Sequence, residues 1–383
     1  MIIKNAKIVL EDKVIETGYL VIENNKITVI HQGNTDEPGI DVKGQWVLPG
    51  FIDCHVHGGY GVDFETGDEH RFETFAINVA QEGITKYLQA SVTNSLENNQ
   101  KYYQEFGNFM ANQTQIGAKC LGAHMEGPFI SPERKGAHEP TLLMSPNIAI
   151  TQSLIDLSNN NLRMVTYAGE LQDGSYTKFL LANQITPSIG HTNMEAWEFA
   201  KDYNLGVRHI THLFNAMSGV DQRRPGLAVA ALNHPDVLVE VISDGIHIHP
   251  DTLKLIYDHK TADHICIITD AMNAKGLPDG EYKLGELEVV KHQMTVALKA
   301  TGVLAGAGAT YDHNVRTYYQ ACQMPMTELI KMTSINIAKQ LGIFEVTGSL
   351  ATNKLADIVV LDQQLKVTMT IVEGRIVYQN HEY

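Results

Sequence analysis

Two histidines separated by a single residue, His55 and His57, are the first indication of chemistry in this sequence. They follow the apolar segment PGFIDC, and because alternate residues of a strand share a face, both imidazoles can bind one ion. Pairs at this spacing also occur by chance on surfaces and in cores. The metal interpretation therefore depends on whether other ligands converge on the same place.

Other apolar segments also end on side chains that can bind a metal, in the strings HMEG, IGHT, ITHLF and ITDA. In a parallel barrel the carboxyl ends of all strands open at one mouth, so these side chains would meet the histidine pair there. Any one of them could instead be a polar residue that caps the next helix, but that explanation is weak for all of them together. The sequence therefore predicts a metal centre formed by His55, His57, Glu126, His191, His212 and Asp270.

Two further histidines stand close to these candidates in sequence. His124, two residues before Glu126, either supports that carboxylate from behind or simply packs. His209 comes three residues before His212, so on a regular strand it should face the other way. We expect His209 to be structural.

The elements that must position these residues are eight apolar segments separated by segments with helical spacing. The segments are FIDCHVH, TKYLQASVT, CLGAHMEG, LRMVTYAGE, TPSIGHT, VRHITHLF, VLVEVISDG and HICIITDAM. This alternation predicts an α/β fold, specifically a (β/α)8 TIM-like barrel. A doubly wound sheet also alternates, but no GxGxxG turn follows the first strand, and polar residues at the strand ends favour the barrel.

The two ends of the chain have a different pattern. Residues 1–50 and 350–383 contain short alternating strands, which we expect to form one small β-sandwich domain beside a barrel of residues 51–349. Three long segments after barrel strands, at 127–160, 215–235 and 272–310, are where such a barrel builds a substrate pocket.

Composition limits the classes of partner. The net charge of −15 without a basic run argues against nucleic acid or an anionic membrane, and no stretch approaches the ~20 apolar residues of a membrane span. The N-terminus alternates apolar and polar residues and lacks the features of a signal peptide. The four cysteines have no CxxC spacing, which suits free thiols in a reducing compartment. We therefore expect a cytoplasmic protein.

The chain also resembles a known family over essentially its whole length. The combination of PGFIDCHVHG, HMEGPFI, KGAHEP, SIGHT, THLFNAM, RRPGLA, SDGIHIHP and ITDAM is similar to the N-acetylglucosamine-6-phosphate deacetylases of the amidohydrolase superfamily. The resemblance implies metal-dependent hydrolysis of N-acetylglucosamine 6-phosphate to glucosamine 6-phosphate and acetate, in amino-sugar catabolism.

The resemblance also implies roles for the candidate ligands. Glu126, His191 and His212 match the family's metal ligands, and His55 with His57 matches the additional pair of members that hold two ions. It thus implies divalent metal ions, two per subunit with Glu126 as the bridge, although zinc, iron, manganese and cobalt cannot be distinguished. Many relatives in the wider superfamily bridge their metals with a lysine on the fourth strand, and LRMVTYAGE contains none.

The remaining roles concern catalysis and substrate binding. The match makes Asp270 the carboxylate that takes a proton from water and returns it to the amine, and His138 the residue that polarises the acetyl carbonyl. It suggests a homodimer in which Arg223 and His247 hold the 6-phosphate across the interface, while the adjacent Arg224 leaves the identity of the main phosphate ligand open. The residues expected to bind substrate are Ala137, His138, Asn215, Ala216, Arg223, His247, Leu304, Ala305 and Gly306.

Two other interpretations fit part of this pattern. A dihydroorotase-like or hydantoinase-like cyclic amidase would share the barrel and the metals, but the missing fourth-strand lysine together with THLFNAM and RRPGLA favours a sugar-phosphate deacetylase. A catalytically silent barrel with a structural role would be expected to lose metal ligands, whereas this chain retains all six.

Overall fold

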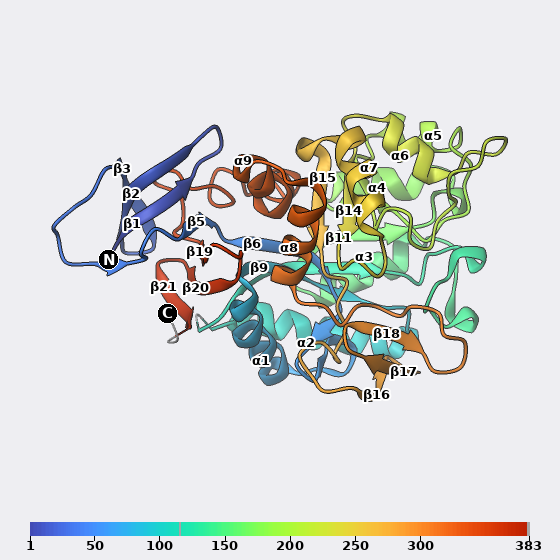
Figure 1. Cartoon of the computed structure of the whole chain (residues 1–383). Helices are drawn as coiled ribbons and strands as arrows, with labels where there is room; N and C mark the ends of the chain where they lie inside the picture. Colours follow the sequence, from blue (N-terminus) through green and yellow to red (C-terminus); the bar gives the residue numbers. More distant parts are fainter. Residues whose placement is uncertain (115, 381–383) are drawn as a thin grey trace.

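A parallel eight-stranded barrel forms the larger part of the computed structural model, which describes residues 1–114 and 116–380 (Figure 1). Its strand order is β15-β14-β13-β12-β11-β10-β9-β6. The strands are β6 (Phe51–Val56), β9 (Ile84–Ser91), β10 (Lys119–Glu126), β11 (Leu162–Tyr167), β12 (Thr186–Ile189), β13 (His209–Ile210), β14 (Leu238–Ile242) and β15 (Ile265–Ile268). Six lie within one of the eight apolar segments, and β9 and β10 each begin one residue before theirs, so the predicted fold class is confirmed.

Backbone hydrogen bonds just beyond β15 join the last strand of the barrel to the first. The N–H of Asp270 donates to the carbonyl of His55 at 2.9 Å, and the N–H of His57 donates to the carbonyl of Ala271 at 2.8 Å. Residues more than two hundred positions apart in sequence are thereby held side by side at the barrel mouth.

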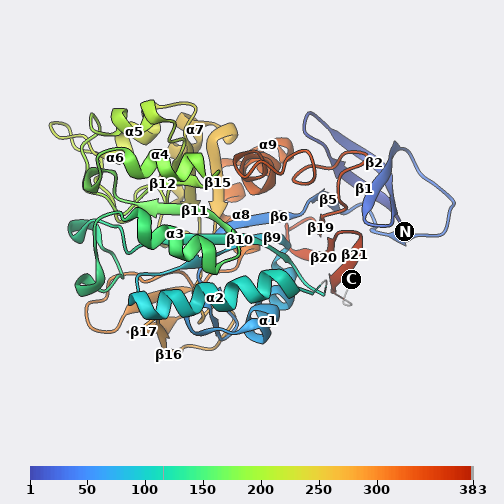
Figure 2. The ribbon, with the colours of Figure 1, turned by 180° about the vertical axis from the view of Figure 1, so that it is seen from behind.

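The helices cover the outside of the barrel because each presents one apolar face to the strands. In α2, for example, Tyr102, Phe106 and Phe109 recur at helical spacing and are buried, and the Ser95 hydroxyl caps the first turn. Figure 2 shows α1 and α2 along one side of the strands and α4 to α7 along the other. The helices are α1 (Glu69–Val79), α2 (Leu96–Asn112), α3 (Ile148–Leu157), α4 (Ser175–Ala182), α5 (Phe199–Leu205), α6 (Leu227–Asn233), α7 (Pro250–Lys260), α8 (Tyr311–Cys322), α9 (Met326–Ile330) and α10 (Asn336–Gln340).

The two terminal segments combine in a second sheet with the order β21-β20-β19-β5-β1-β2-β3, with β4 paired to β1 (Figure 1). The core of this sheet is an apolar cluster that includes Ile8, Leu20, Ile358 and Ile371. The strands are β1 (Ile2–Val9), β2 (Val14–Glu23), β3 (Lys26–Gln32), β4 (Ile40–Asp41), β5 (Trp46–Pro49), β19 (Ile358–Leu361), β20 (Val367–Val372) and β21 (Arg375–Gln379).

The segment between β15 and α8 carries a small antiparallel sheet that the sequence interpretation did not foresee. Its strands are β16 (Gly280–Leu284), β17 (Leu287–His292) and β18 (Thr295–Leu298). Its buried side chains, among them Leu284, Val289 and Val296, pack with Ala137 and Ala305. A two-stranded hairpin, β7 (Gly58–Gly59) with β8 (Val62–Asp63), follows β6.

None of the helices in the described part of the chain has the length and apolar character that crossing a membrane requires.

Candidate metal centre and active site

A cavity of about 350 Å³ opens at the carboxyl ends of the barrel strands, which is within the ~300–1,000 Å³ typical of small-molecule sites. All three long segments singled out in the sequence contribute to its wall. The lining residues are His57, Val92, Glu126, Gly136, Ala137, His138, His191, His212, Asn215, Ala216, His247, Asp270, Leu284, Val303, Leu304 and Gly306.

Most of the residues predicted for the site lie in this wall, and three do not. His55 lies just behind it, with its Nε2 3.3 Å from Nε2 of His57. Ala305 is fully buried in the cluster that packs β16 to β18 against the loops. Arg223 is exposed on a loop outside the cavity. Sequence reasoning had not identified four of the lining residues: Val92, Gly136, Leu284 and Val303.

Glu126 lies at the centre of the histidine cluster. Its Oε1 atom is 2.9 Å from Nε2 of His212, 3.3 Å from Nε2 of His191 and 3.5 Å from Nε2 of His55. Its Oε2 atom is 3.2 Å from Nε2 of His57. One carboxylate therefore touches all four imidazoles, which divide into two groups around it, with His55 and His57 in one and His191 and His212 in the other.

Asp270 completes the set of six. Its Oδ1 atom is 3.1 Å from Nε2 of His57 and 3.8 Å from Nε2 of His55. Asp270, His191 and His212 all have positive φ, at 50°, 46° and 26°. Non-glycine residues adopt this region only where the surroundings impose it, and here each strand ends in a turn that directs the side chain into the mouth.

The hydrogen bonds on the far side of the imidazoles test whether a metal fits. Nδ1 of His55 lies 2.9 Å from a Glu240 carboxylate oxygen, Nδ1 of His191 lies 2.8 Å from the Arg134 carbonyl, and Nδ1 of His57 lies 3.2 Å from a carbonyl of β9. Carbonyls and carboxylates only accept hydrogen bonds, so in a neutral ring Nδ1 carries the proton.

The Nε2 atoms of His55, His57 and His191 are then left with lone pairs, and those of His55 and His57 are 3.3 Å apart. Nε2 of His191 is 3.1 Å from Nε2 of His212, whose Nδ1 has no hydrogen-bond partner among the described residues. Lone pairs this close repel unless a positive charge lies between them, and imidazoles held from behind by acceptors are the usual surroundings of a metal ion. The residues present therefore fit a divalent cation.

The electrostatics of the cluster agree with this fit. Burial would raise the pKa of Glu126, but its interactions with the neighbouring histidines His55 and His191 outweigh burial and hold it well below its usual range. Burial would lower the pKa of His57, yet its hydrogen bonds to Asp270 and Glu126 raise it to about 9. Two carboxylates in a buried pocket thus attract positive charge, which protons or a metal ion can supply.

Asp270 keeps its negative charge at neutral pH. Its burial favours the protonated form, but the hydrogen bond from His57 and the charge of His55 lower its pKa. A carboxylate that faces the cavity can accept a proton from a water molecule there.

His138 is held as a neutral ring by its burial and by Thr93. Burial lowers its pKa to about 4. The backbone N–H of Thr93 donates to Nδ1 at 3.3 Å, and the Thr93 hydroxyl is 2.7 Å from the same atom. The proton of the neutral ring therefore sits on Nε2, which lies 3.6 Å from Oε2 of Glu126 and faces the cavity. Thr93 ends the second apolar segment, a position by which it could have been identified.

His247 lines the cavity of its own chain, together with Asp270. The resemblance places His247 in a neighbouring subunit's site, whereas in this chain His247 follows β14 at the mouth of its own barrel, with its Nδ1 2.8 Å from Oδ2 of Asp244. Burial would lower its pKa, but the hydrogen bond and charge of Asp244 outweigh burial and raise it. Asp244, in the string SDGIHIHP, was not singled out as a site residue.

Arg223 and Arg224 differ clearly in their surroundings. Nη2 of Arg224 lies 2.6 Å from Oε1 of Glu195, and Nε of Arg224 lies 2.9 Å from the same atom. Within residues 1–114 and 116–380, the Arg223 guanidinium makes no hydrogen bond or ion pair, whereas its backbone N–H binds Asp221. Arg223 is thus the arginine available to a ligand outside the chain.

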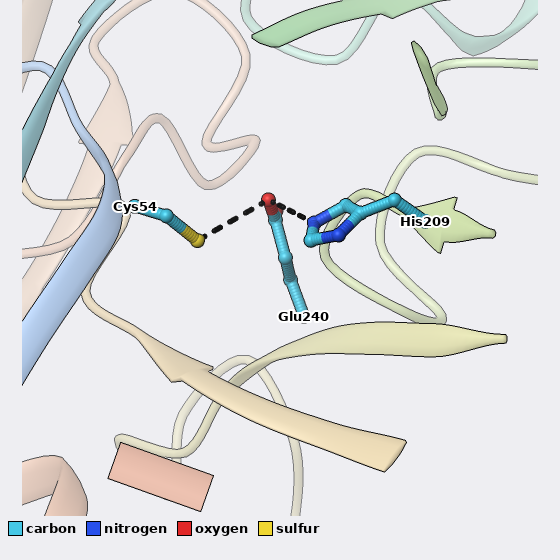
Figure 3. A group of neighbouring side chains, drawn as sticks. All are labelled: Cys54, His209 and Glu240. Atoms are coloured by element: carbon cyan, nitrogen blue, oxygen red, sulfur yellow. Dashed lines mark hydrogen bonds and ion pairs between the residues drawn. The ribbon is translucent and has the colours of Figure 1, made fainter. Parts of the chain in front are cut away.

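The two histidines set aside in the sequence both lie inside the barrel. His124 hydrogen-bonds the Cys54 carbonyl at 3.0 Å and the Thr166 hydroxyl at 2.8 Å, and burial lowers its pKa to about 3. The expectation that His209 faces away from the site is wrong: its Nε2 lies 3.0 Å from Oε1 of Glu240 inside the barrel (Figure 3). Strand β13 ends at Ile210, so strict alternation does not extend to His212.

Residues 46–377 match the Amidohydrolase family, and the chain belongs to that family. It is 33% identical to the N-acetylglucosamine-6-phosphate deacetylase of Bacillus subtilis (strain 168) over 389 aligned residues, which cover 100% of this chain and 98% of that protein. It is also 33% identical to the N-acetylgalactosamine-6-phosphate deacetylase of Escherichia coli O157:H7, over 86% of this chain and 87% of that protein.

A solved structure of an N-acetyl-D-glucosamine-6-phosphate deacetylase from Mycobacterium smegmatis has the same architecture. The two chains superpose with a TM-score of 0.93 at 28% identity, over 99% of each. That structure is of an aspartate-to-alanine mutant in complex with N-acetyl-D-glucosamine-6-phosphate.

Proposed function

We propose that this chain hydrolyses N-acetylglucosamine 6-phosphate to glucosamine 6-phosphate and acetate. The observation that carries the proposal is the convergence of three functions on one cavity: the histidine cluster around Glu126, the carboxylate of Asp270 and the Nε2–H of His138. Relatives over the full length of the chain bear this activity in their names, and one solved relative binds this sugar phosphate.

The residues divide the work of amide hydrolysis. A divalent ion bound by the cluster would supply Lewis acidity for the water and the amide carbonyl. Asp270 accepts the proton from the attacking water and delivers it to the amide nitrogen as the C–N bond breaks, so that the amine leaves neutral. His138 donates from Nε2 to the carbonyl oxygen and stabilises the negative charge that grows there. Because its pKa is about 4, the His138 ring is already neutral at pH 7, and it donates a hydrogen bond from Nε2 without transferring the proton.

The number of ions follows from the two ligand groups. We propose two per chain, one bound by His55, His57 and Glu126 and the other by Glu126, His191 and His212, with Glu126 as the shared ligand. Imidazole and carboxylate ligands accept zinc, iron, manganese or cobalt, so metal supply selects among them.

Binding of the phosphate requires positively charged side chains, and the cavity supplies only some of them. Its lining residues in the described chain include His247 but no lysine or arginine. We propose that Arg223 of the partner subunit completes the phosphate site in a homodimer, since a guanidinium donates two parallel hydrogen bonds to phosphate. Val220, three residues before Arg223, is 70% exposed, and Trp197, which shares Glu195 with Arg224, is 72% exposed, and such exposed apolar side chains suit an interface.

The cellular context is inferred from the cysteines and the substrate. All four cysteines are free thiols, which suits a reducing compartment, so we propose a cytoplasmic enzyme of amino-sugar catabolism.

The experiment that tests the function compares substrates directly. Purified metal-loaded protein is incubated with N-acetylglucosamine 6-phosphate, N-acetylgalactosamine 6-phosphate, unphosphorylated N-acetylglucosamine and dihydroorotate, and acetate release or ring opening is measured. We expect N-acetylglucosamine 6-phosphate to release acetate faster than the other three compounds. The galactosamine epimer belongs in the panel because a relative of equal identity bears its name. Ring opening of dihydroorotate without acetate release would replace the proposal with the cyclic amidase alternative.

A further inference from the structure

A buried carboxylate, Glu240 on β14, lies directly behind the histidine cluster and belongs to none of the roles assigned above. Oε2 of Glu240 lies 2.9 Å from Nδ1 of His55 and accepts the backbone N–H of His212 at 3.2 Å. Oε1 lies 3.0 Å from Nε2 of His209 and 3.8 Å from Sγ of Cys54. Figure 3 shows Glu240 between the side chains of Cys54 and His209.

The surroundings of Glu240 fix the direction of each hydrogen bond. The side chains of Glu240, His55, His209 and Cys54 are all fully buried. An ionised carboxylate only accepts, and a backbone N–H only donates, so Oε2 holds two donors, one of which is Nδ1–H of His55. A neutral imidazole carries one ring proton, so a proton fixed on Nδ1 leaves Nε2 of His55 as a free lone pair toward His57 and Glu126.

We infer that Glu240 is a positioning residue that holds His55 in the tautomer and orientation required for metal binding, and so determines the affinity of the His55/His57 side of the metal centre. The inference rests on the metal centre of the proposed function but not on its substrate. Glu240 also holds the backbone of His212, but not its imidazole, so the His191/His212 side depends on it less.

The same cluster could be thought to bind an ion itself, since Cys54, His209 and Glu240 lie close enough to share one. Two observations argue against this. Burial, together with the neighbouring Cys266, raises the pKa of the Cys54 thiol well above its usual value, so it stays protonated. The carboxylate of Glu240 is moreover already engaged by donors at both oxygens.

The test replaces Glu240 by glutamine, which keeps the shape but removes the charge and one acceptor. If the amide NH2 faces His55, Nδ1 must accept and the proton moves to Nε2, where it blocks the metal. If the NH2 faces His209, that ring must carry its proton on Nδ1, which has no hydrogen-bond partner among the described residues. The first arrangement reverses the tautomer of His55, and the second leaves Nδ1–H of His55 bonded to a neutral amide oxygen, which is a weaker acceptor than a carboxylate.

Metal affinity is the readout. Metal-free wild type and Glu240→Gln are titrated with zinc or cobalt against a competing chelator, and both binding steps are measured. We expect the step assigned to His55 and His57 to weaken by ~10–100-fold, the usual effect of losing such a partner, while the other step changes much less. Cys54→Ala is the matched control, because it perturbs the same buried cluster at its longest contact and should leave both steps unchanged.

A second variant set separates positioning from general loosening. In a chain that already carries His55→Ala and His57→Ala, adding Glu240→Gln should change the affinity of the remaining ion by much less than it changes the His55/His57 step in the wild-type background. The inference would be overturned if Glu240→Gln weakened both binding steps equally, or if it left the step assigned to His55 and His57 unaltered. So would a third ion in wild type that Cys54→Ala removes.

The wild-type protein provides a check that does not depend on the variant folding. Nitrogen-15 NMR of histidine-labelled, zinc-loaded protein should show His55 protonated at Nδ1 and His209 at Nε2, and a proton on Nε2 of His55 would overturn the inference. None of these readouts uses a sugar phosphate. A failed deacetylase assay with normal metal binding would therefore count against the proposed function alone.

Discussion

The Thr93 hydroxyl lies 2.7 Å from Nδ1 of His138, and the backbone N–H of Thr93 points at the same nitrogen from 3.3 Å. A nitrogen that accepts from an N–H has no proton of its own, so the neutral His138 ring presents Nε2–H to the cavity. Thr93 thus determines which end of the His138 ring can donate to a substrate carbonyl, although Thr93 itself does not line the cavity.

Replacing Thr93 by valine should slow turnover without changing substrate binding. The variant keeps the backbone donor but loses the hydroxyl, and one neutral hydrogen bond contributes ~0.5–1.5 kcal/mol, so we expect kcat to fall about 2- to 13-fold. Thr93→Ser keeps the hydroxyl and is the control, which should remain near wild type. Steady-state kinetics of acetate release decide, and equal kcat values for the valine variant and wild type would remove Thr93 from this role.

Asp270→Asn should abolish proton transfer while the barrel stays folded. The amide cannot accept the proton of water, so we expect turnover to fall by at least ~10²-fold. Circular dichroism and metal analysis should show the fold and most of the bound metal retained. Activity within a few-fold of wild type would show that another group performs the transfer.

The candidate site could be predicted from the sequence to the extent that each residue ends a strand. Glu126, His191, His212 and Asp270 stand at the ends of apolar segments, and barrel geometry alone brings such positions together. The residues that the sequence missed act through other side chains. Thr93 ends an apolar segment as the ligands do, but its role comes from His138 on a distant loop, and the role of Glu240 comes from His55 on β6, so the pattern along one strand does not reveal either role.

The prediction for the orientation of His209 was wrong because the strand ends earlier than its pattern suggests. Its prediction assumed a regular strand up to His212, whereas β13 contains only His209 and Ile210, and the backbone of His212 has a φ of 26°. The sheet β16 to β18 was missed for another reason. Its alternating segments follow the last barrel strand, where the sequence suggested only an excursion.

The contribution of His247 to phosphate binding should depend on pH. Its raised pKa keeps the ring protonated to a pH above the usual histidine value of ~6.5, so binding is strongest below the raised pKa and is lost as the pH rises through it. We expect KM to increase with pH on the alkaline side, where the substrate phosphate, with a pKa of ~6, is already fully ionised. Asp244→Asn should move this increase to lower pH, and His247→Asn should abolish it. A KM that depends on pH identically in all three proteins would exclude His247.

The two halves of the histidine cluster should bind metal independently enough to be separated. Replacing His55 and His57 by alanine leaves Glu126, His191 and His212, which is a sufficient set for one ion. Elemental analysis after reconstitution should therefore find two ions per chain in wild type and one in the double variant. Equal metal content in both proteins, at one ion per chain, would refute the binuclear arrangement.

The origin of the phosphate site can be tested with mixed dimers, because Arg223 lies outside the cavity whereas His247 lines it. If Arg223 acts across the interface, a chain with Asp270→Asn and a chain with Arg223→Ala together form one intact site. The Arg223→Ala chain supplies the metal ligands and Asp270, and its partner supplies the arginine. Each parent should be weak at low substrate concentration, yet the purified hybrid should recover about half of wild-type activity if the two sites act independently.

The matched hybrid pairs Asp270→Asn with His247→Asn chains. His247 lines the same cavity as Asp270 of its own chain, so in this hybrid every site carries one defect and activity should stay near the average of the two parents. Recovery in the Arg223 hybrid but not in the His247 hybrid is the result we expect. If neither recovers, Arg223 acts within its own chain or not at all, because the same Asp270→Asn partner has then failed to supply it. If both recover, His247 also acts across the interface, and its own-chain position would have to change when the dimer forms.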